Sequence, residues 1–387
     1  MVSKKYNIIF VLLDGARVDR LSKSGKFTKL ISKGTFFSQM IAAAPYTVAS
    51  VHAMLSGMYG SKNGVDAYNN MFKFKDNCKT LASYLKDDGY YTRGGTFRLS
   101  LVPERGFDKL SEHQSETSVS LEEHLQLIDE MENIEQPFFL YLHYADIHSS
   151  IVKNVYDKYT DFDDEYFDNI DNNSERYDRL ICDTGDYIDN IYRYLNQKNM
   201  LDDTILVVTS DHGMGVGEKK GERAYGIFNY DYSIKSFSIF IQPALFKQNQ
   251  TISKQTRTID IMPTIMEING INQDTSSLSI QGESLLPLTN TSFLSKVGSF
   301  FGNSIPERIA YCETGGLFGP WPSPKKPNVK SVRTNQWKLI HNLTPGSWEL
   351  YDLLNDPDES INVIGKNPII ENKLRRHLNN IVKDCLK

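Results

Sequence analysis

The chain has 387 residues and carries 43 Lys and Arg against 48 Asp and Glu, which gives a formal net charge of −5. Hydrophobic residues make up 40% of it and charged residues 24%, an ordinary globular composition that excludes disordered, collagen-like and coiled-coil chains. The mild negative charge argues against general nucleic-acid binding. A chain of this length has room for one large α/β domain and a smaller C-terminal piece.

The predicted elements alternate between short apolar runs and longer segments with helical periodicity. In chain order, strands are expected at 7–13, 90–97, 137–143, 204–209 and 237–241, and helices at 47–56, 80–87, 121–131, 174–195 and 260–267. This alternation predicts an α/β fold in which a central, mostly parallel sheet lies between layers of helices.

The first apolar run follows two lysines and therefore imitates a signal peptide. It is too short for a secretory signal or a membrane span, and Asp14 ends it. We expect a buried first strand, no membrane span and a cytoplasmic protein. The four cysteines have no CxxC spacing, which fits neither a disulfide framework nor a zinc knuckle and favours a reducing compartment. They are Cys78, Cys182, Cys312 and Cys385.

The C-terminal part of the sequence has a different texture. From about residue 288 it is rich in Gly, Pro and Ser, with short strands expected at 309–312, 329–333, 337–340 and 349–351 and a helix at 368–385. We therefore expect a catalytic α/β domain over 1–287 and a smaller α+β subdomain over 288–387. The segments 149–171 and 315–330 are expected to be loops that shape a substrate pocket.

Polar side chains follow three of the predicted strands. They are Asp14, the pair Asp211 and His212, and the group His143, Asp146 and His148. Ligands of open α/β sheets bind at the carboxyl edge of the strands, and carboxylates with imidazole are a ligand set for divalent cations. One such residue has a structural explanation, since Asp14 fits an Asx-turn and Asp211 a helix N-cap. Three strand ends in one chain favour a metal site.

Thr47 lies at the expected N-terminus of the helix at 47–56. Threonine is a common N-cap, which is the structural alternative. A hydroxyl at this place also faces free N–H groups and the positive end of the helix dipole, which suits an alkoxide or a bound oxyanion. Contact with a cation would ease loss of its proton and make Thr47 a nucleophile.

A series of motifs over residues 6–359 resembles the sulfatase branch of the alkaline phosphatase superfamily. In family order they read DGARVDR, LSGMYGSKNGV, LKDDGYYT, ERGFD, FFLYLHYADIH, TSDHG and ELYDLLNDPDE. The resemblance implies a central sheet between helix layers, a smaller C-terminal antiparallel sheet, and hydrolysis or transfer at a phosphate or sulfate ester.

The same resemblance assigns roles to individual residues. It places Asp14, Asp211 and His212 on metal-ligand positions and Thr47 on the nucleophile position. His148 falls where the family has a substrate-contacting histidine, with His143 nearby on the same strand end. Possible anion contacts, with solvated basic surface as the alternative, are Arg98, Lys220, Arg223 and Lys338. Tyr225 and Trp321 would stack on a sugar ring or serve packing.

The sequence departs from this family at the nucleophile. Sulfatases carry Cys or Ser in a Cys-x-Pro-x-Arg frame that is oxidised to formylglycine, whereas this frame reads TVASV over 47–51. Threonine is a secondary alcohol, so its oxidation gives a ketone and not the aldehyde. Threonine nucleophiles are found in phosphodiesterase and phosphotransferase relatives, which favours phosphorus. Gly15 replaces a second ligand Asp that sulfatases often have.

We therefore expect one divalent ion, Mn²⁺, Zn²⁺, Ca²⁺ or Mg²⁺, held by Asp14, Thr47, Asp211 and His212. Thr47 would attack a phosphate ester and form a covalent intermediate, while His148 or His143 protonates the leaving oxygen. The expected substrate is a small-molecule or glycan ester. The alternatives are a sulfuric ester hydrolase acting without formylglycine and a non-catalytic anion- or glycan-binding relative.

Overall fold

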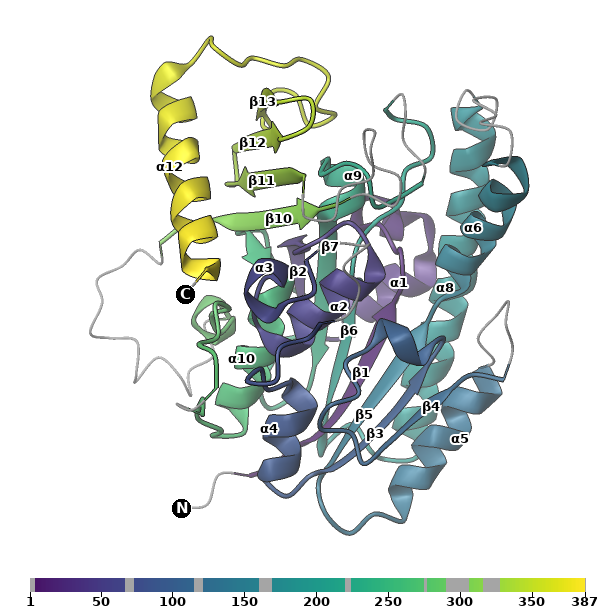
Figure 1. Cartoon of the computed structure of the whole chain (residues 1–387). Helices are drawn as coiled ribbons and strands as arrows, with labels where there is room; N and C mark the ends of the chain where they lie inside the picture. Colours follow the sequence, from purple (N-terminus) through teal and green to yellow (C-terminus); the bar gives the residue numbers. More distant parts are fainter. Residues whose placement is uncertain are drawn as a thin grey trace.

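A nine-stranded sheet forms the centre of the protein in the computed structural model (Figure 1), which describes residues 4–66, 73–114, 121–159, 169–219, 224–274, 277–289, 306–315 and 328–386. The strands are β1 (Asn7–Leu13), β2 (Thr35–Ile41), β3 (Tyr91–Thr96), β4 (Lys109–Glu112), β5 (Phe138–Tyr144), β6 (Thr204–Thr209), β7 (Lys235–Ile241), β8 (Gln250–Ile252) and β9 (Thr256–Arg257). Their order is β4-β3-β5-β1-β6-β7-β2-β8, with β9 paired to β2.

The half of this sheet that carries the site is parallel. From β4 through β3, β5 and β1 to β6, every neighbouring pair runs parallel, whereas β7 is antiparallel to both β6 and β2. Parallel neighbours bring their carboxyl ends to one edge of the sheet. The predicted fold class is confirmed.

Helices cover both faces of the sheet (Figure 1). They are α1 (Gly25–Ile31), α2 (Thr47–Ser56), α3 (Gly60–Asn63), α4 (Leu81–Asp87), α5 (Leu121–Glu132), α6 (Asp146–Tyr159), α8 (Ile170–Gln197), α9 (Asp231–Ile234), α10 (Ile261–Ile268) and α12 (Pro368–Cys385). Short 3-10 turns occur at Val18–Lys23, Leu99–Leu101, Thr258–Asp260 and Leu286–Leu288. None of the helices within these described ranges has the length and apolar character needed to cross a bilayer.

Two apolar cores explain why the central strands read as continuous hydrophobic runs. Alternate residues of β1 point to opposite faces. Ile9 and Val11 pack with residues of α1, α5 and α8, whereas Ile8 and Phe10 pack with residues of α2, α4 and α10. Because both faces of the strand are buried, every residue from Ile8 to Leu13 is apolar.

A second, four-stranded antiparallel sheet lies beside the first with α12 against it (Figure 1). Its strands are β10 (Ala310–Thr314), β11 (Val329–Arg333), β12 (Trp337–Asn342) and β13 (Ser347–Asp352). Val332, Leu339 and Leu374 share one core with Tyr59, which follows α2. This core joins the C-terminal elements to the main sheet; the division at residue 288 stays a prediction.

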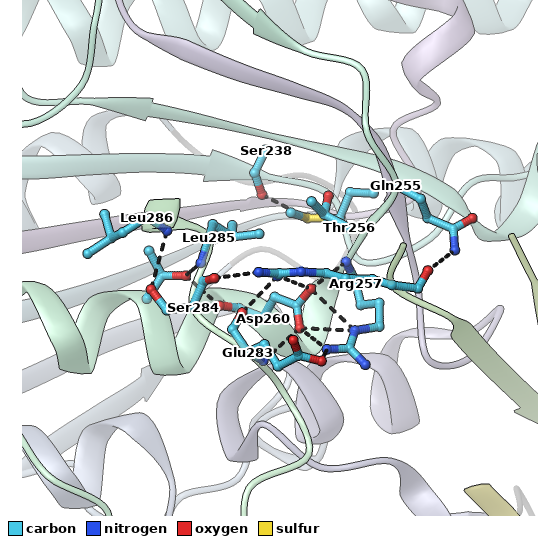
Figure 2. A network of polar contacts seen from close by, with 12 residues as sticks. Ser238, Gln255, Thr256, Arg257, Asp260, Glu283, Ser284, Leu285 and Leu286 are labelled. Atoms are coloured by element: carbon cyan, nitrogen blue, oxygen red, sulfur yellow. Dashed lines mark hydrogen bonds and ion pairs between the residues drawn. The ribbon is translucent and has the colours of Figure 1, made fainter. Parts of the chain in front are cut away.

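A buried ionic network also joins the two parts (Figure 2). The Asp260 carboxylate is fully buried and accepts hydrogen bonds from Arg257 Nη2 and Arg308 Nη1, each at 2.8 Å. Its oxygens also accept from the backbone N–H groups of Arg257 and Glu283. Asp260 precedes α10 and Arg308 precedes β10, so one carboxylate ties both segments together.

Several elements differ from expectation. The segment after His148 was expected to be a loop, but residues 149–159 continue α6. Residues 170 and 171 begin α8, and 160–168 and 316–327 lie outside the described residues. The apolar periodicity of 146–159 is weaker than that of α8, so the helical signal in the sequence is weaker for this segment.

Candidate active site

The carboxyl ends of β1 and β6 deliver the three side chains at the centre of the site. β1 lies between β5 and β6, so the residues after these strands meet at one edge. Asp14, Asp211 and His212 are buried, and each offers a ligand atom within 4.8 Å of the others. The sheet order therefore brings together residues that lie almost 200 positions apart in sequence.

Thr47 closes this cluster from the other side. Its Oγ1 lies 3.3 and 3.2 Å from the two carboxylate oxygens of Asp14 and 3.1 Å from His212 Nε2. The expectation that Thr47 is the N-cap was wrong, because Tyr46 is the N-cap and Thr47 is the first helical residue of α2. The hydroxyl bonds the carboxylate instead of the backbone. Ser50 Oγ, one turn on, donates to the Asp211 carbonyl at 2.8 Å and fixes the helix to the end of β6.

The donor atoms of this cluster fit a divalent cation. Asp211 Oδ1 accepts from the N–H groups of Gly15 and His212, whereas its buried Oδ2 has no hydrogen-bond partner among the described residues. His212 Nδ1 lies 2.8 Å from the Gly213 carbonyl, which can only accept, so Nδ1 carries a proton. In the neutral ring Nε2 then offers its lone pair to the cluster. An imidazole that is oriented by a carbonyl group, together with carboxylate oxygens, is a set of ligands that can hold a divalent metal ion.

The two carboxyl groups have opposite electrostatic environments. Burial opposes ionisation of Asp14, but His148, His143 and His212 outweigh it and hold the pKa of Asp14 well below its usual range. For Asp211, burial and then the charge of Asp14 raise the pKa to about 6. A positive ion between the two carboxylates would offset the burial of both groups and the repulsion between them. This is the arrangement expected of carboxylate ligands around a cation.

Gly15 follows the first ligand in a left-handed conformation, with a φ of 77°. Its N–H donates to Asp211 Oδ1 at 3.2 Å. A Cβ at this position would lie 2.8 Å from Met214 Sδ. The position where sulfatases often have a second Asp is thus built here for a residue without a side chain.

His143 is fully buried on β5, with Nε2 3.1 Å from Asp14 Oδ2 and Nδ1 3.0 Å from Thr96 Oγ1. Both ring nitrogens are therefore engaged with protein groups. The expectation that His143 protonates a leaving group does not fit this arrangement, since neither nitrogen is open to a substrate.

His148 lies in the first turn of α6 and is half-buried beside the cluster. Its ring centroid is 6.2 Å from that of His212 and 4.8 Å from that of Tyr225. Burial lowers the pKa of His148. Tyr225 also stacks on His212, with centroids 5.5 Å apart. Tyr225 was predicted either to stack on a sugar ring or to serve packing. Its ring contacts with His148 and His212 place it in the wall of the site.

The four basic residues expected to contact an anion have different outcomes. Arg98 forms a surface ion pair with Glu112 at 2.7 Å, with its side chain 42% exposed. Lys338 was wrongly assigned: it is fully buried in β12, with Nζ 2.5 Å from Asp231 and 2.7 Å from Glu359. The alternation of polar and apolar residues in this short strand does not indicate that Lys338 pairs with two buried carboxylates. Lys220 and Arg223 lie outside the described residues, as does Trp321.

Sequence reasoning missed Arg17. Its buried guanidinium donates to the Met214 carbonyl at 3.1 Å and forms ion pairs with Asp19 and Glu218. Arg17 therefore ties the segment after β1 to the segment after His212. The charged pattern of DGARVDR was the only signal, and it indicates a polar turn without naming the partner.

Comparison with known proteins places these observations in a family. The family model described as Sulfatase matches residues 6–271. The chain belongs to the sulfatase family. The order of its motifs and its layered fold agree with the sulfatase branch of the alkaline phosphatase superfamily, as the resemblance implied.

Curated sulfatase relatives match part of the chain. Arylsulfatase K from Bos taurus is 30% identical over 247 residues, which cover 62% of this chain and 41% of the relative. An N-acetylglucosamine-6-O-sulfatase from Bacteroides thetaiotaomicron is 29% identical over 187 residues, covering 46% of this chain and 30% of the relative. The match thus spans about two fifths of the arylsulfatase K length.

Solved structures with the same fold match 98–99% of the chain. The phosphonate monoester hydrolase of Agrobacterium radiobacter has a TM-score of 0.78 at 16% identity, covering 98% of this chain and 96% of its own. A protein solved in complex with its substrate D-glucosamine-2-N,6-O-disulfate has a TM-score of 0.76 at 20% identity, covering 99% and 98%. At these identities the likeness establishes the fold alone.

Proposed function

We propose that this protein is a metal-dependent hydrolase of phosphate esters, either monoesters or diesters, that acts through a covalent intermediate on Thr47. The observation that carries the proposal is the position of Thr47 Oγ1, 3.1–3.3 Å from both carboxylate oxygens of Asp14 and from His212 Nε2. A buried hydroxyl that touches candidate metal ligands at a helix N-terminus has the surroundings of an activated nucleophile.

Asp14, Asp211 and His212 would hold one divalent ion, which would lower the pKa of the adjacent hydroxyl and polarise a non-bridging oxygen of the ester. Thr47 gives up its hydroxyl proton to solvent, and its Oγ forms a bond to phosphorus as the bond from phosphorus to the leaving oxygen breaks. N–H groups at the start of α2 face the negative charge that develops on the phosphoryl oxygens. The scissile group is thereby held between the helix and the strand ends.

His148 would protonate the leaving oxygen, because its ring lies beside that of His212 and the residue is only half-buried. Burial lowers its pKa, which favours release of a proton. Water then attacks phosphorus in the second step, its proton returns to the imidazole, and the Thr47 oxygen leaves. The Thr47 oxygen takes a proton back from solvent, so atoms and charges return to their starting state after one turnover.

Phosphorus is favoured over sulfur by the chemistry of the side chain. Thr47 cannot become formylglycine, because its β-carbon carries a methyl group and would give a ketone. It keeps a simple hydroxyl that can be phosphorylated and released.

A second candidate is sulfate ester hydrolysis by the same hydroxyl, on a small-molecule or glycan substrate. Membership in the sulfatase family favours it, as do relatives named arylsulfatase K and N-acetylglucosamine-6-O-sulfatase. The two candidates share the nucleophile and the cation site and differ only in the transferred group.

The deciding assay compares turnover of nitrophenyl phosphate, bis-nitrophenyl phosphate and nitrophenyl sulfate by the full chain, with added divalent ions and with chelator. We expect phosphate ester turnover that chelator and Thr47→Ala both abolish, and a phosphorylated Thr47 peptide in acid-quenched samples. Thr251→Ala removes an exposed threonine and is the matched control. Full activity in Thr47→Ala would exclude the covalent step, and faster sulfate than phosphate turnover would establish the second candidate.

A protein that binds no divalent ion and turns over none of these esters would instead be a non-catalytic anion- or glycan-binding relative.

A further inference from the structure

His143 lies between two neighbouring strands, where it contacts the candidate metal ligand Asp14 and is closed off from solvent. His143 lies on β5 opposite Leu12 of β1 in the parallel register, and β1 is the strand that Asp14 follows. Its side chain is completely buried. Nε2 lies 3.1 Å from Asp14 Oδ2. An ionised carboxylate can only accept, so Nε2 carries a proton and donates it to this oxygen.

The other ring nitrogen is held just as closely. Nδ1 lies 3.0 Å from Thr96 Oγ1, at the end of β3, which is the neighbour of β5 on the far side from β1. Thr96 is itself fully buried, and its hydroxyl also lies 3.2 Å from the Arg98 carbonyl. The imidazole therefore bridges the ends of β3 and β1, and rotation of its ring would break both hydrogen bonds.

The buried carboxylate of Asp14 contacts several groups at once, so its orientation depends on its hydrogen-bond partners. Its Oδ1 lies 3.3 Å from Thr47 Oγ1 and 3.5 Å from His212 Nε2. A hydrogen bond to Oδ2 restricts rotation of the carboxylate and leaves the remaining lone pairs aimed at the cation site. Partners that hydrogen-bond metal-ligating groups typically change metal affinity 10- to 100-fold.

We propose that His143 is a positioning residue, which together with Thr96 holds the Asp14 carboxylate in the orientation that binds the cation and meets the Thr47 hydroxyl. The inference deepens the proposed function and rests on it for the effect on turnover, while its effect on metal affinity is separate from any reaction. It differs from the predicted role of His143 as a proton donor, which requires a nitrogen open to the substrate.

The test measures binding of Mn²⁺ to the metal-free full chain by isothermal titration and by electron paramagnetic resonance, with no substrate present. Three substitutions divide the functions of the ring. His143→Gln can place an amide N–H near the position of Nε2, His143→Asn can place one near Nδ1, and His143→Leu removes both. We expect Mn²⁺ affinity to fall about 10- to 100-fold in the Leu and Asn variants, and to be largely restored in the Gln variant.

Thr96 supplies an independent pair of variants. Thr96→Val removes the hydroxyl at nearly constant shape, and Thr96→Ser keeps it. The Val variant is expected to lower Mn²⁺ affinity less than His143→Leu, and the Ser variant to match the wild type. His341→Leu is the matched control for loss of an imidazole, because His341 lies in the C-terminal sheet and stacks on Trp348 with centroids 3.7 Å apart.

Circular dichroism and thermal unfolding identify any variant that fails to fold, and Thr96→Val then carries the test. Equal affinities in the wild type, His143→Leu and Thr96→Val would overturn the proposal, as would a Gln variant no better than Leu. Absence of ester turnover in a wild type that binds Mn²⁺ would overturn the proposed function and leave the affinity comparison valid. A wild type that binds no Mn²⁺ would overturn the positioning role.

Discussion

The buried carboxylate of Asp260 provides a sharp test of what joins the two sheets (Figure 2). Asp260→Asn keeps the size of the side chain but leaves Arg257 and Arg308 without their shared negative partner. These guanidinium side chains are only 9% and 6% exposed, so water cannot replace the lost charge. Removing one partner of a buried ion pair costs about 3–5 kcal/mol.

The effect on thermal unfolding follows from the size of the chain. An unfolding entropy of about 2.1 cal/mol/K per residue over 387 residues is about 0.8 kcal/mol/K. The loss therefore lowers Tm by about 4–6 °C, measured by calorimetry. Glu283→Gln is the matched control: it removes another carboxylate that pairs with Arg257, but its side chain is 61% exposed, so its loss costs no more than about 1 kcal/mol.

Equal Tm values for Asp260→Asn and the wild type would refute this reasoning, because they would mean that the buried carboxylate contributes no net interaction. A fall for Glu283→Gln as large as that for Asp260→Asn would refute the dependence on burial.

Three further predictions concern the site and its surroundings. Burial and the charge of Asp14 raise the pKa of Asp211 to about 6, so protons compete with the cation for this carboxylate below that pH. The apparent Mn²⁺ affinity, measured by titration, should therefore fall as the pH drops from 7 to 5 and should be constant above pH 7. If His148 protonates the leaving oxygen, His148→Gln should slow alkyl phosphate esters about 100-fold but nitrophenyl esters much less, and equal slowing would contradict that role. Lys338→Met leaves the buried carboxylate of Glu359 without its cation, while Asp231 keeps its ion pair with Arg333, so denaturant titration should show a loss of about 3–5 kcal/mol. A higher KM with unchanged stability would instead restore its predicted role as a substrate contact.

Sequence patterns predicted those elements whose signal is local. The strands at Asn7–Leu13 and Thr204–Thr209 and the helices at Thr47–Ser56 and Pro368–Cys385 have the expected bounds, because an apolar run or a helical period marks each one. β2 (Thr35–Ile41) was missed. It is polar at Ser38 and Gln39, its pairing with β7 is interrupted by a register shift, and it is held by distant partners rather than by its own pattern.

The site divides along the same line. Asp14, Asp211 and His212 could be predicted because each lies within three residues of the end of its strand, and the sheet order then brings them together. The engagement of His143 with Thr96 depends on β3 and β5 being neighbours, which no local pattern reveals. Lys338 was predicted to contact a substrate, because a lysine in a short strand gives no sign that two buried carboxylates face it.

The backbone at Gly15 has a consequence for how this site can change. An aspartate at that position would have to adopt a positive φ, and its Cβ would lie 2.8 Å from Met214 Sδ. For most residues other than glycine the left-handed conformation costs about 1–2 kcal/mol even before that contact, and aspartate tolerates it better than most. A second carboxylate at this position therefore requires both an unusual backbone conformation and a movement of the Met214 side chain. A second acidic ligand would therefore cost least in a variant that changes residue 214 to a smaller side chain together with Gly15.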